Sequence, residues 1–489
     1  MGLKVKINKI LILLSLLPLS TNAQRLLTLD SCRAMALRNN KQISVSKAKQ
    51  DVAANMRRSA RTKYLPHVSA VGGYMWMSKE ASILNDDQKS GLNNLGTTAV
   101  TGLQDRLGGI ISLLPAAAQA QLAQNMAQFG GALNQTGAGV VNAFRTDTRN
   151  TFAGAIMVTQ PVFMGGAIIA LNKMADISEH MAENSLESMR QNTLFSIDQA
   201  YWQVVSLRHK EKLAESYVEL VKKLESDVQK MVNEGVATRS DKLSVSVKVN
   251  EAQMSLQKVT DGLVLSKMLL CQLCGLPVSE QVKLADEESD NIAVMDMNAQ
   301  PDVEMATLHR PELKMLQNTV DLSRQATNLL KAGNLPQVLL TGGYAVSNPN
   351  VFNGFEKKFA GFWNVGVLMR VPIWNWGDVR YKVRAAKGAT TIASLELDEA
   401  REKIELQVNQ KAFMVNEANK KLAMAQSNIE HAEENLRTAN LGFKEGVISA
   451  TTIMEAQTAW LKAQSQRIDA EIEVKLSQVE LQKALGTLE

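Results

Sequence analysis

The chain has 489 residues, of which 45% are hydrophobic, with 54 lysines and arginines against 49 aspartates and glutamates. Three of the basic residues, Lys4, Lys6 and Lys9, lie in the first ten positions, and without them 51 basic residues face 49 acidic ones, a net charge of +2. So small a net charge excludes the strongly basic surface of a nucleic-acid-binding protein.

The first residues have the pattern of an export signal. The three lysines precede an apolar stretch over residues 10–19, and Thr21-Asn22-Ala23 resembles a small-residue cleavage site. The apolar stretch is too short to span a bilayer, and no later segment offers 18 consecutive apolar residues. We predict a signal peptide that ends near Ala23, with no lipid anchor because no cysteine directly follows the cleavage site.

The rest of the chain is a duplicated unit. Two landmarks recur 270 positions later, and three others recur 211 positions later. The first set pairs residues 65–68 with 335–338 and 72–74 with 342–344; the second pairs 161–163 with 372–374, 234–236 with 445–447, and Gly275 with Gly486. The two offsets differ by 59 residues, which indicates an insertion in the first half between Tyr74 and Pro161.

Each unit ends in two long helical stretches. Residues 167–234 contain no glycine or proline, and a continuous helix of that length would measure about 100 Å. In the second half, apolar residues and alanines alternate in steps of three and four, which is the 3.5-residue period of a coiled coil. These seam residues are Leu422, Ala425, Ile429, Ala432, Leu436, Ala439 and Phe443. Gly235 and Gly446 each follow a glutamate, so the long helices are predicted to be hairpins.

The β-like runs are short and few. Trp363, Val365, Val367, Met369 and Val371 lie on one face of a strand, and aromatic residues stand near the run ends, as in outer-membrane strands. A half-buried hairpin of a soluble protein would show the same alternation. Four strands cannot close a barrel, and an open edge is not allowed in lipid, so membrane-spanning strands would require several chains to pool them.

The predicted organisation follows the two repeats. A signal peptide is followed by three parts of the first repeat, a connecting segment and three parts of the second repeat. The parts are 1–23 signal peptide, 24–65 N-terminal helix, 66–163 first strand pair with an enlarged extracellular loop at about 77–150, 164–277 first helical hairpin, 278–308 connecting segment, 309–335 second-repeat helix, 336–374 second strand pair, and 375–489 second helical hairpin.

These landmarks resemble the TolC-like outer-membrane factors. Leu27-Thr28-Leu29-Asp30 leading into Ala36-Leu37-Arg38-Asn39-Asn40 is similar to the opening of that family. The LPxV runs, QPVFMGG and VPIWNWG after the strands, and the two EGV helix turns also look like the family. The resemblance covers essentially the whole mature chain, and the order and spacing of the motifs make it specific.

The resemblance implies a mainly α fold with a small β part. Long antiparallel coiled-coil hairpins would form a periplasmic tunnel, and four transmembrane strands per chain would contribute to a shared trimeric β-barrel in the outer membrane. The protein would be a passive exit duct of a tripartite efflux or type I secretion system, and not an enzyme. Its partners would be two further copies, a periplasmic adaptor protein, an inner-membrane pump and outer-membrane lipid, with no cofactor, metal or nucleic acid.

The family carries its functional residues at the helix turns. Acidic residues one turn apart narrow the periplasmic mouth, and the matching positions here are Asp241, preceded by Ser240, and Thr452 with Glu455. One carboxylate of the second pair is thus missing. Asp241 and Glu455 could also be ordinary solvated residues in the first turns of their helices. Gly235, Val236, Gly446 and Val447 resemble adaptor-docking tips, although an ordinary turn explains the glycines equally well.

Other interpretations have weaker support. A soluble periplasmic coiled-coil scaffold or adaptor explains the helices but not the paired strand–loop–strand inserts.

Cys271 and Cys274 form a CxxC pair without a second pair or neighbouring histidine, which favours small residues on a packed helix face. Cys32 is the third cysteine, and three are too few for a disulfide framework. The 22 methionines would suit metal export, but they are dispersed. We find no catalytic motif.

Overall fold

The computed structural model describes residues 25–145, 147–289, 292, 298–353 and 356–489. The predicted signal peptide over residues 1–23 lies outside them. The chain divides into two compact units. The helical unit contains Met1–Arg58, Ala170–Thr327 and Lys382–Glu489, and the strand unit contains Ser59–Ile169 and Asn328–Tyr381.

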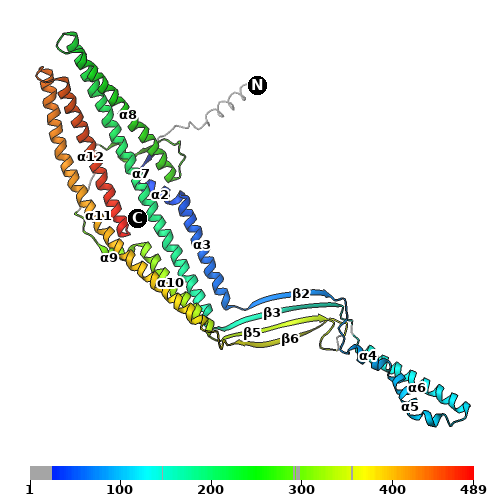
Figure 1. The fold of residues 1–489 in the computed structure, drawn as a ribbon. Coiled ribbons are helices and arrows are strands. Elements are labelled where there is room, and N and C mark those ends of the chain that lie inside the picture. Colours follow the sequence, from blue (N-terminus) through cyan, green and yellow to red (C-terminus); the bar gives the residue numbers. More distant parts are fainter. Residues whose placement is uncertain (1–24, 146, 290–291, 293–297, 354–355) are drawn as a thin grey trace, which may run out of the picture. The chain divides into compact units, whose positions relative to one another are not determined.

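Two long helical hairpins dominate the helical unit (Figure 1). The first consists of α7 (Ala167–Asn233) and α8 (Arg239–Cys274), and the second of α11 (Asp378–Lys444) and α12 (Ala450–Leu485). The paired helices have equal lengths, 67 residues for α7 and α11 and 36 residues for α8 and α12. The absence of helix breakers lets α7 run through the whole predicted stretch, and both hairpins are confirmed.

The predicted seam of α11 packs as expected. Leu422, Ile429 and Phe443 are buried, as are Ala432 and Ala439, and the two remaining seam residues are half-buried. The 3.5-residue spacing places these side chains on one stripe of the helix, which therefore faces a neighbouring helix along its length. Leu422 belongs to a core cluster with Ala470 and Val474 of α12, so α12 is one such neighbour.

Shorter elements complete the helical unit, with some ends in the strand unit. Two helices, α2 (Leu29–Asn39) and α3 (Lys41–Arg61), occupy the segment where one helix was expected. Asn40 separates them: its backbone is extended, and its side-chain carbonyl accepts a hydrogen bond from the Gln42 amide at 2.7 Å. The other elements are β1 (Arg25–Leu27), β4 (Val282–Leu284), η2 (Ala285–Glu288), α9 (Val303–His309) and α10 (Pro311–Lys331).

The largest core cluster joins both ends of the first repeat. β1 pairs in parallel with β4, more than 250 positions later in the chain. Beside this pair, Tyr201 and Val205 of α7 pack with Leu270 of α8. Arg33 of α2 reaches the fully buried Asp198 of α7 through two hydrogen bonds of 2.7 and 2.5 Å. The guanidinium satisfies the buried carboxylate, which would otherwise be costly to bury.

The duplication extends to individual contacts. A Cβ atom on Gly275 would collide with Asn39, and one on Gly486 would collide with His309, which are equivalent pairs in the two repeats. In the first repeat, the side-chain amide of Asn39 donates to the Cys274 carbonyl at 3.2 Å. In the second repeat, Arg310, the residue after His309, donates its guanidinium to the Ala484 carbonyl at 3.2 Å. Each repeat therefore covers the last turn of its second long helix with the corresponding stretch of chain.

The strand unit contains one four-stranded antiparallel sheet. Its order is β2-β3-β5-β6, formed by β2 (His67–Trp76), β3 (Asn150–Met164), β5 (Gln337–Asn348) and β6 (Ala360–Arg370). The short helices η1 (Thr62–Tyr64) and η3 (Ala332–Asn334) precede β2 and β5. With the hairpins, this sheet confirms the predicted fold class, mainly α with a small β part.

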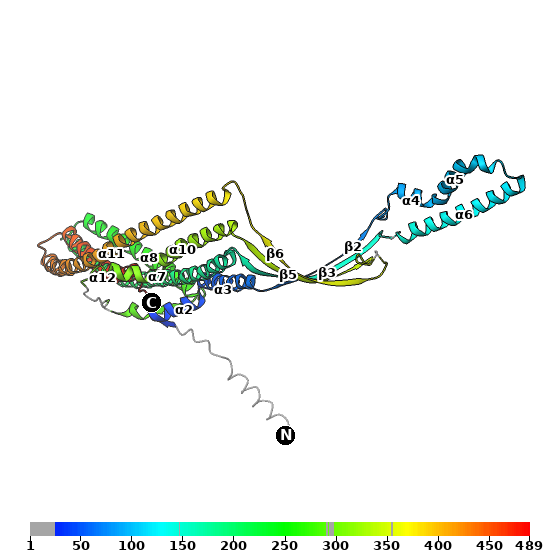
Figure 2. The ribbon, with the colours of Figure 1, turned by 90° about the horizontal axis from the view of Figure 1, so that it is seen from below.

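The inserted segment between β2 and β3 is helical (Figure 2). It holds α4 (Asp86–Asn93), α5 (Leu95–Ile111) and α6 (Ala116–Ala143), within the loop predicted at about 77–150. Glycines allow the helices to approach closely: a Cβ atom on Gly96 of α5 would collide with the backbone of Gly130 in α6. The corresponding connection between β5 and β6 in the second repeat spans only residues 349–359.

Candidate functional sites at the helix turns and on the sheet

Both hairpin turns begin with the same helix ending. Gly235 and Gly446 have φ angles of 77° and 72°, the left-handed conformation in which a side chain would be strained. The Gly235 amide donates to the Val232 carbonyl at 3.1 Å, and the Val236 amide donates to the Met231 carbonyl at 2.8 Å. This pair of bonds is the Schellman motif, which satisfies the last carbonyls of α7.

The second turn repeats this geometry. The Gly446 amide donates to the Phe443 carbonyl at 3.1 Å, and the Val447 amide donates to the Gly442 carbonyl at 2.8 Å. Val236 and Val447 follow the two glycines and are 70% and 77% exposed. Each turn therefore presents an apolar side chain to solvent on a rigid backbone.

The returning helix of the first hairpin starts with a capping box that the sequence analysis did not identify. The Thr238 hydroxyl accepts a hydrogen bond from the Asp241 amide at 3.1 Å. In return, the Asp241 carboxylate accepts from the Thr238 amide at 2.9 Å and from the Thr238 hydroxyl at 2.7 Å. A Thr-x-x-Asp pattern before a helix is the signal that could have revealed it.

The capping box also favours the ionised form of Asp241. The hydrogen bonds from the Thr238 hydroxyl and amide favour the ionised carboxylate and hold the pKa of Asp241 below its ordinary range. The carboxylate is turned back toward the start of its own helix. Among the predicted gate residues, Asp241 thus has a local structural role, while the neighbouring Ser240 is exposed.

The second hairpin uses hydroxyl groups at the same positions. Ser449 corresponds to Thr238, and its hydroxyl accepts from the Thr452 amide at 3.3 Å. The Thr452 hydroxyl lies 3.1 Å from the Ser449 hydroxyl, where the first hairpin has a carboxylate. The α12 helix is therefore capped without a negative charge in its first turn.

The two turns are joined by a shared core. Buried residues of all four long helices form one cluster below the turns, and Met231, Ala237 and Ile448 pack against it. Its members are Leu224, Val228, Val245, Phe443, Ala450 and Ile453. The two turns therefore lie side by side in one chain, as Figure 1 shows.

Glu455 lies one turn beyond Thr452, on the exposed side of α12. It lines a groove of about 610 Å³ between α8 and α12, together with Val247, Met454 and two lysines, Lys248 and Lys462. Lys248 forms an ion pair with Glu251 in the same groove, with an N–O distance of 3.2 Å. Of the predicted carboxylates, Glu455 is therefore the one whose side chain is outside a helix cap.

The strand register places the larger aromatic residues and many of the β-branched residues of the four strands on one face of the sheet. Directly paired residues share a face, and the pairs Tyr74–Phe152, Ile156–Tyr344 and Tyr344–Trp363 link the strands. Large residues of this face are exposed, with Trp363 at 77% and Val365 at 69%. The members are Val68, Tyr74 and Trp76; Phe152, Ile156 and Val158; Leu340, Tyr344 and Val346; and Trp363, Val365, Val367 and Met369.

The opposite face of the sheet is more polar. It carries Ser69, Thr159, Thr341, Asn364 and Arg370, interspersed with apolar residues such as Val71, Met157 and Leu368. At the end of the sheet that joins the insertion, aromatic side chains of the apolar face gather, and the rings of Tyr74 and Phe152 are 4.8 Å apart. An exposed apolar face with an aromatic border is the pattern of a strand that faces lipid.

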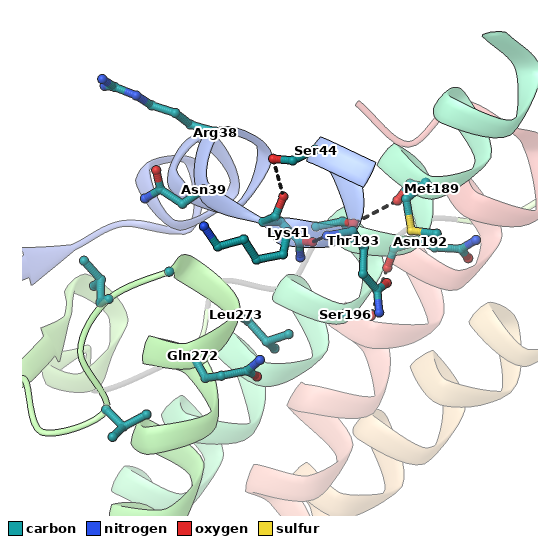
Figure 3. Close-up of a pocket in the computed structure, with 15 residues that line it drawn as sticks. Arg38, Asn39, Lys41, Ser44, Met189, Asn192, Thr193, Ser196, Gln272 and Leu273 are labelled. Atoms are coloured by element: carbon teal, nitrogen blue, oxygen red, sulfur yellow. Dashed lines mark hydrogen bonds between the residues drawn. The ribbon is translucent and has the colours of Figure 1, made fainter. Parts of the chain in front are cut away.

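A polar cavity of about 900 Å³ lies where α2, α3, α7 and α8 meet (Figure 3). Its hydroxyl groups are already bonded to their own helices: Ser44 donates to the Asn40 carbonyl at 3.2 Å and Thr193 to the Met189 carbonyl at 2.8 Å. Arg38 and Lys41 are its charged lining residues, and no carboxylate, histidine or thiol lines it.

Within the described residues, no group of three or more histidines, cysteines or carboxylates is placed to hold a metal ion. Over the same ranges, no helix combines the length and the apolar character needed to cross a bilayer.

Long helical hairpins that carry a small sheet with an exposed apolar face are the architecture of an outer-membrane channel protein. The chain matches the outer membrane efflux protein family over residues 112–276 and 303–487, and it belongs to that family. The family was correctly predicted from the repeated motifs. Its members are channels and not enzymes, and they are located in the outer membrane.

Individual relatives agree with this assignment. Outer membrane protein TolC of Vibrio cholerae is 21% identical over 345 residues, which cover 69% of this chain and 77% of that protein. Among solved structures, the fold is similar to CusC, with a TM-score of 0.72, 13% identity and coverage of 94% and 92% of the two chains. It is also similar to CmeC of Campylobacter jejuni, with a TM-score of 0.70, 14% identity and coverage of 94% and 86%. The family match, and not these individual similarities, disfavours the alternative of a soluble scaffold.

Proposed function

We propose that three copies of this chain form the outer-membrane exit duct of a tripartite efflux or type I secretion system. The four strands of each copy would contribute to one twelve-stranded barrel, and the helical hairpins would form a tunnel in the periplasm. An inner-membrane pump and a periplasmic adaptor would deliver small molecules or proteins to it. The duct itself would be passive.

The sheet is the observation that carries this proposal. β2 and β6 each have one neighbour among the described strands, so each leaves a row of backbone amides and carbonyls unpaired. Lipid cannot satisfy these groups, and the apolar face of the same strands is exposed. The three antiparallel pairings make the two edge strands run in opposite directions, so β6 of one copy could pair antiparallel with β2 of the next.

Oligomer mass tests this proposal directly. Protein extracted from outer membranes in mild detergent should have the protein mass of three chains when measured by light scattering with the detergent contribution subtracted. A Pro substitution at Val367, in the middle of β6, should reduce the trimer because proline removes a ladder hydrogen bond. A folded monomer from the native membrane would contradict the shared barrel.

The helix turns support a role at the periplasmic entrance. Three copies of Glu455 and Asp241 would gather carboxylates around the tunnel axis, with Ser240 and Thr452 beside them as neutral positions. Gly235 with Val236, and Gly446 with Val447, would form the tips that the adaptor contacts. The rigid Schellman turns and the exposed valines suit such docking, because little conformational freedom is lost on binding.

A further inference from the structure

The first repeat buries two cysteines against each other. Cys32 on α2 and Cys274 in the last turn of α8 are both fully buried in the core cluster that joins the ends of the repeat. The Cys274 sulfur lies 3.9 Å from the Cys32 carbonyl oxygen, although 242 positions separate the two residues in the chain. We propose that these two thiols are oxidised to a disulfide in the exported protein.

The surroundings hold the two residues together. Asn39, at the end of α2, donates its side-chain amide to the Cys274 carbonyl at 3.2 Å, and Arg33 anchors the same helix to Asp198 of α7. The Cys274 thiol donates to the Cys32 carbonyl, and the interaction between the two side chains lowers the pKa of Cys32 and, together with burial, raises that of Cys274. Both cysteines are fully buried in one core cluster, and the bond from the Cys274 sulfur to the Cys32 carbonyl shows that this side chain lies directly beside Cys32.

The third cysteine is directed elsewhere. The Cys271 sulfur donates to the Glu280 carbonyl at 3.7 Å, in the segment that follows α8. The CxxC spacing therefore does not define the redox pair here, and we expect Cys271 to remain a thiol. The second repeat has Asp302 and Leu485 at the positions equivalent to Cys32 and Cys274, so the bond would be a feature of the first repeat alone.

The compartment supplies the chemistry. An outer-membrane protein passes through the periplasm, an oxidising environment in which thiols meet protein disulfide oxidants. The Cys32 thiolate would attack a disulfide of such an oxidant, forming a mixed disulfide and releasing one oxidant thiol. The Cys274 thiolate would then attack the Cys32 sulfur and release the second oxidant thiol. The oxidant gains the two electrons that this chain loses, and because the folded sites are buried, the exchange would precede final packing.

Trypsin provides a direct readout on the wild-type protein. The enzyme would release Cys32 on the peptide of residues 26–33, and Cys271 with Cys274 on the peptide of residues 268–283. Cells are lysed in the presence of N-ethylmaleimide, which alkylates free thiols. The outer-membrane fraction is then isolated, and its protein is denatured without reductant and digested with trypsin. We expect the two peptides to be linked, with the alkyl group on Cys271 and fragmentation assigning the bond to Cys274. One thiol per chain should react, and three should react after reduction.

Matched variants identify the partner. Cys271→Ser should keep the linked peptides, whereas Cys32→Ser and Cys274→Ser should each lose the 32–274 link. Three alkylated cysteines in the unreduced wild type would overturn the proposal, as would a bond from Cys271 to either of the others. The proposal depends on the outer-membrane location and not on the trimer or the efflux partners, so its failure would leave the proposed function untouched.

Discussion

At the scale of single residues, one position distinguishes the two hairpins. Asp241 and Thr452 are equivalent third residues of the returning helices, and both take part in capping. The first hairpin gains a carboxylate near a helix N-terminus, where the helix dipole favours negative charge. In terms of the family pattern, the threonine at position 452 is a missing gate carboxylate. The structure shows that the same change also alters how the first turn of the returning helix is stabilised.

Thr238→Ala should loosen the first turn of α8. Loss of an N-cap costs about 1 kcal/mol, so the Asp241 amide should exchange with solvent about fivefold faster. Hydrogen exchange of peptides that cover residues 236–243 would measure this acceleration. The control is Ser240→Ala, which removes a hydroxyl from the same exposed turn. Equal acceleration in both variants would mean that the hydroxyl of Thr238 does not cap the helix.

The same turn should respond to acid. The pKa of Asp241 is lowered in the folded protein by its bonds to Thr238, so the folded state holds this proton less tightly than the unfolded state. The contribution of the capping box is therefore complete above the ordinary aspartate pKa of about 3.9 and is lost as the pH falls through the lower folded value. As the pH falls over that interval, amide hydrogen exchange in α8 should accelerate more in the wild-type protein than in the Asp241→Asn variant. The variant has no carboxylate to protonate at this position.

Glu455→Gln tests the proposed gate. Three carboxylates near one axis would attract multivalent cations, and each unit charge at about 4 Å in water contributes on the order of 1 kcal/mol, or about fivefold in affinity. In planar bilayers, block by a trivalent cation from the periplasmic side should weaken in Glu455→Gln. Thr452→Asp, which adds the missing carboxylate, should strengthen the block. Unchanged block and ion selectivity in both variants would return Glu455 to the role of a solvated helix residue.

At the scale of elements, the insertion differs from the rest of the chain. Helix α6 has 28 residues and no charged side chain, and its glycines and alanines allow close helix packing. Gly130 of α6 faces Gly96 of α5, and Gly137 of α6 lies against the backbone of Leu92 in α4. Small residues thus replace large apolar ones as the means of holding these helices together.

Gly96→Ala should therefore separate α5 from α6. The added methyl group would meet the Gly130 backbone, which cannot rotate away, and such overpacking costs about 1–3 kcal/mol. Gly102→Ala on the same helix has open space around it and serves as the matched control. Hydrogen exchange and limited proteolysis of residues 86–143 should show opening only in Gly96→Ala. The same opening in both variants would exclude glycine packing as its cause.

At the scale of the whole molecule, duplication explains the paired hairpins and the four strands, and one enlarged loop breaks the symmetry. If the strands span the outer membrane with the helix turns in the periplasm, the insertion must lie outside the cell. Under that condition its exposure to the medium follows from the chain connectivity, because the insertion joins the ends of β2 and β3 that are opposite to those leading to α3 and α7.

An epitope tag tests this topology, and the structure selects its position. Asn134 is unsuitable because its side chain accepts hydrogen bonds from the amides of Gly96 and Thr97, at 2.7 and 3.2 Å. Leu113, between α5 and α6, is 84% exposed. A tag there should bind antibody on intact cells, whereas a tag after Glu489 should require rupture of the outer membrane. The reverse pattern would invert the topology.

Local pattern was sufficient to predict the repeating elements of this protein. The missing helix breakers predicted α7, the 3.5-residue spacing predicted the buried stripe of α11, and the recurring landmarks predicted two hairpins and four strands. Each of these properties depends on residues close together in the chain, so periodicity expresses it directly. The helix break at Asn40 and the capping box between Thr238 and Asp241 also depend on neighbouring residues, although helical periodicity does not express them.

The tertiary structure decided what depends on distant residues. The parallel pairing of β1 with β4, the strand order and the contact of Cys32 with Cys274 each join segments far apart in the chain. No local pattern specifies such a partner, because many segments have the same propensity and only the packed fold selects among them. The sequence by itself determined the long hairpins, the four strands and the family. The fold decided which strands pair, which residues share a face of the sheet, and which cysteines are neighbours.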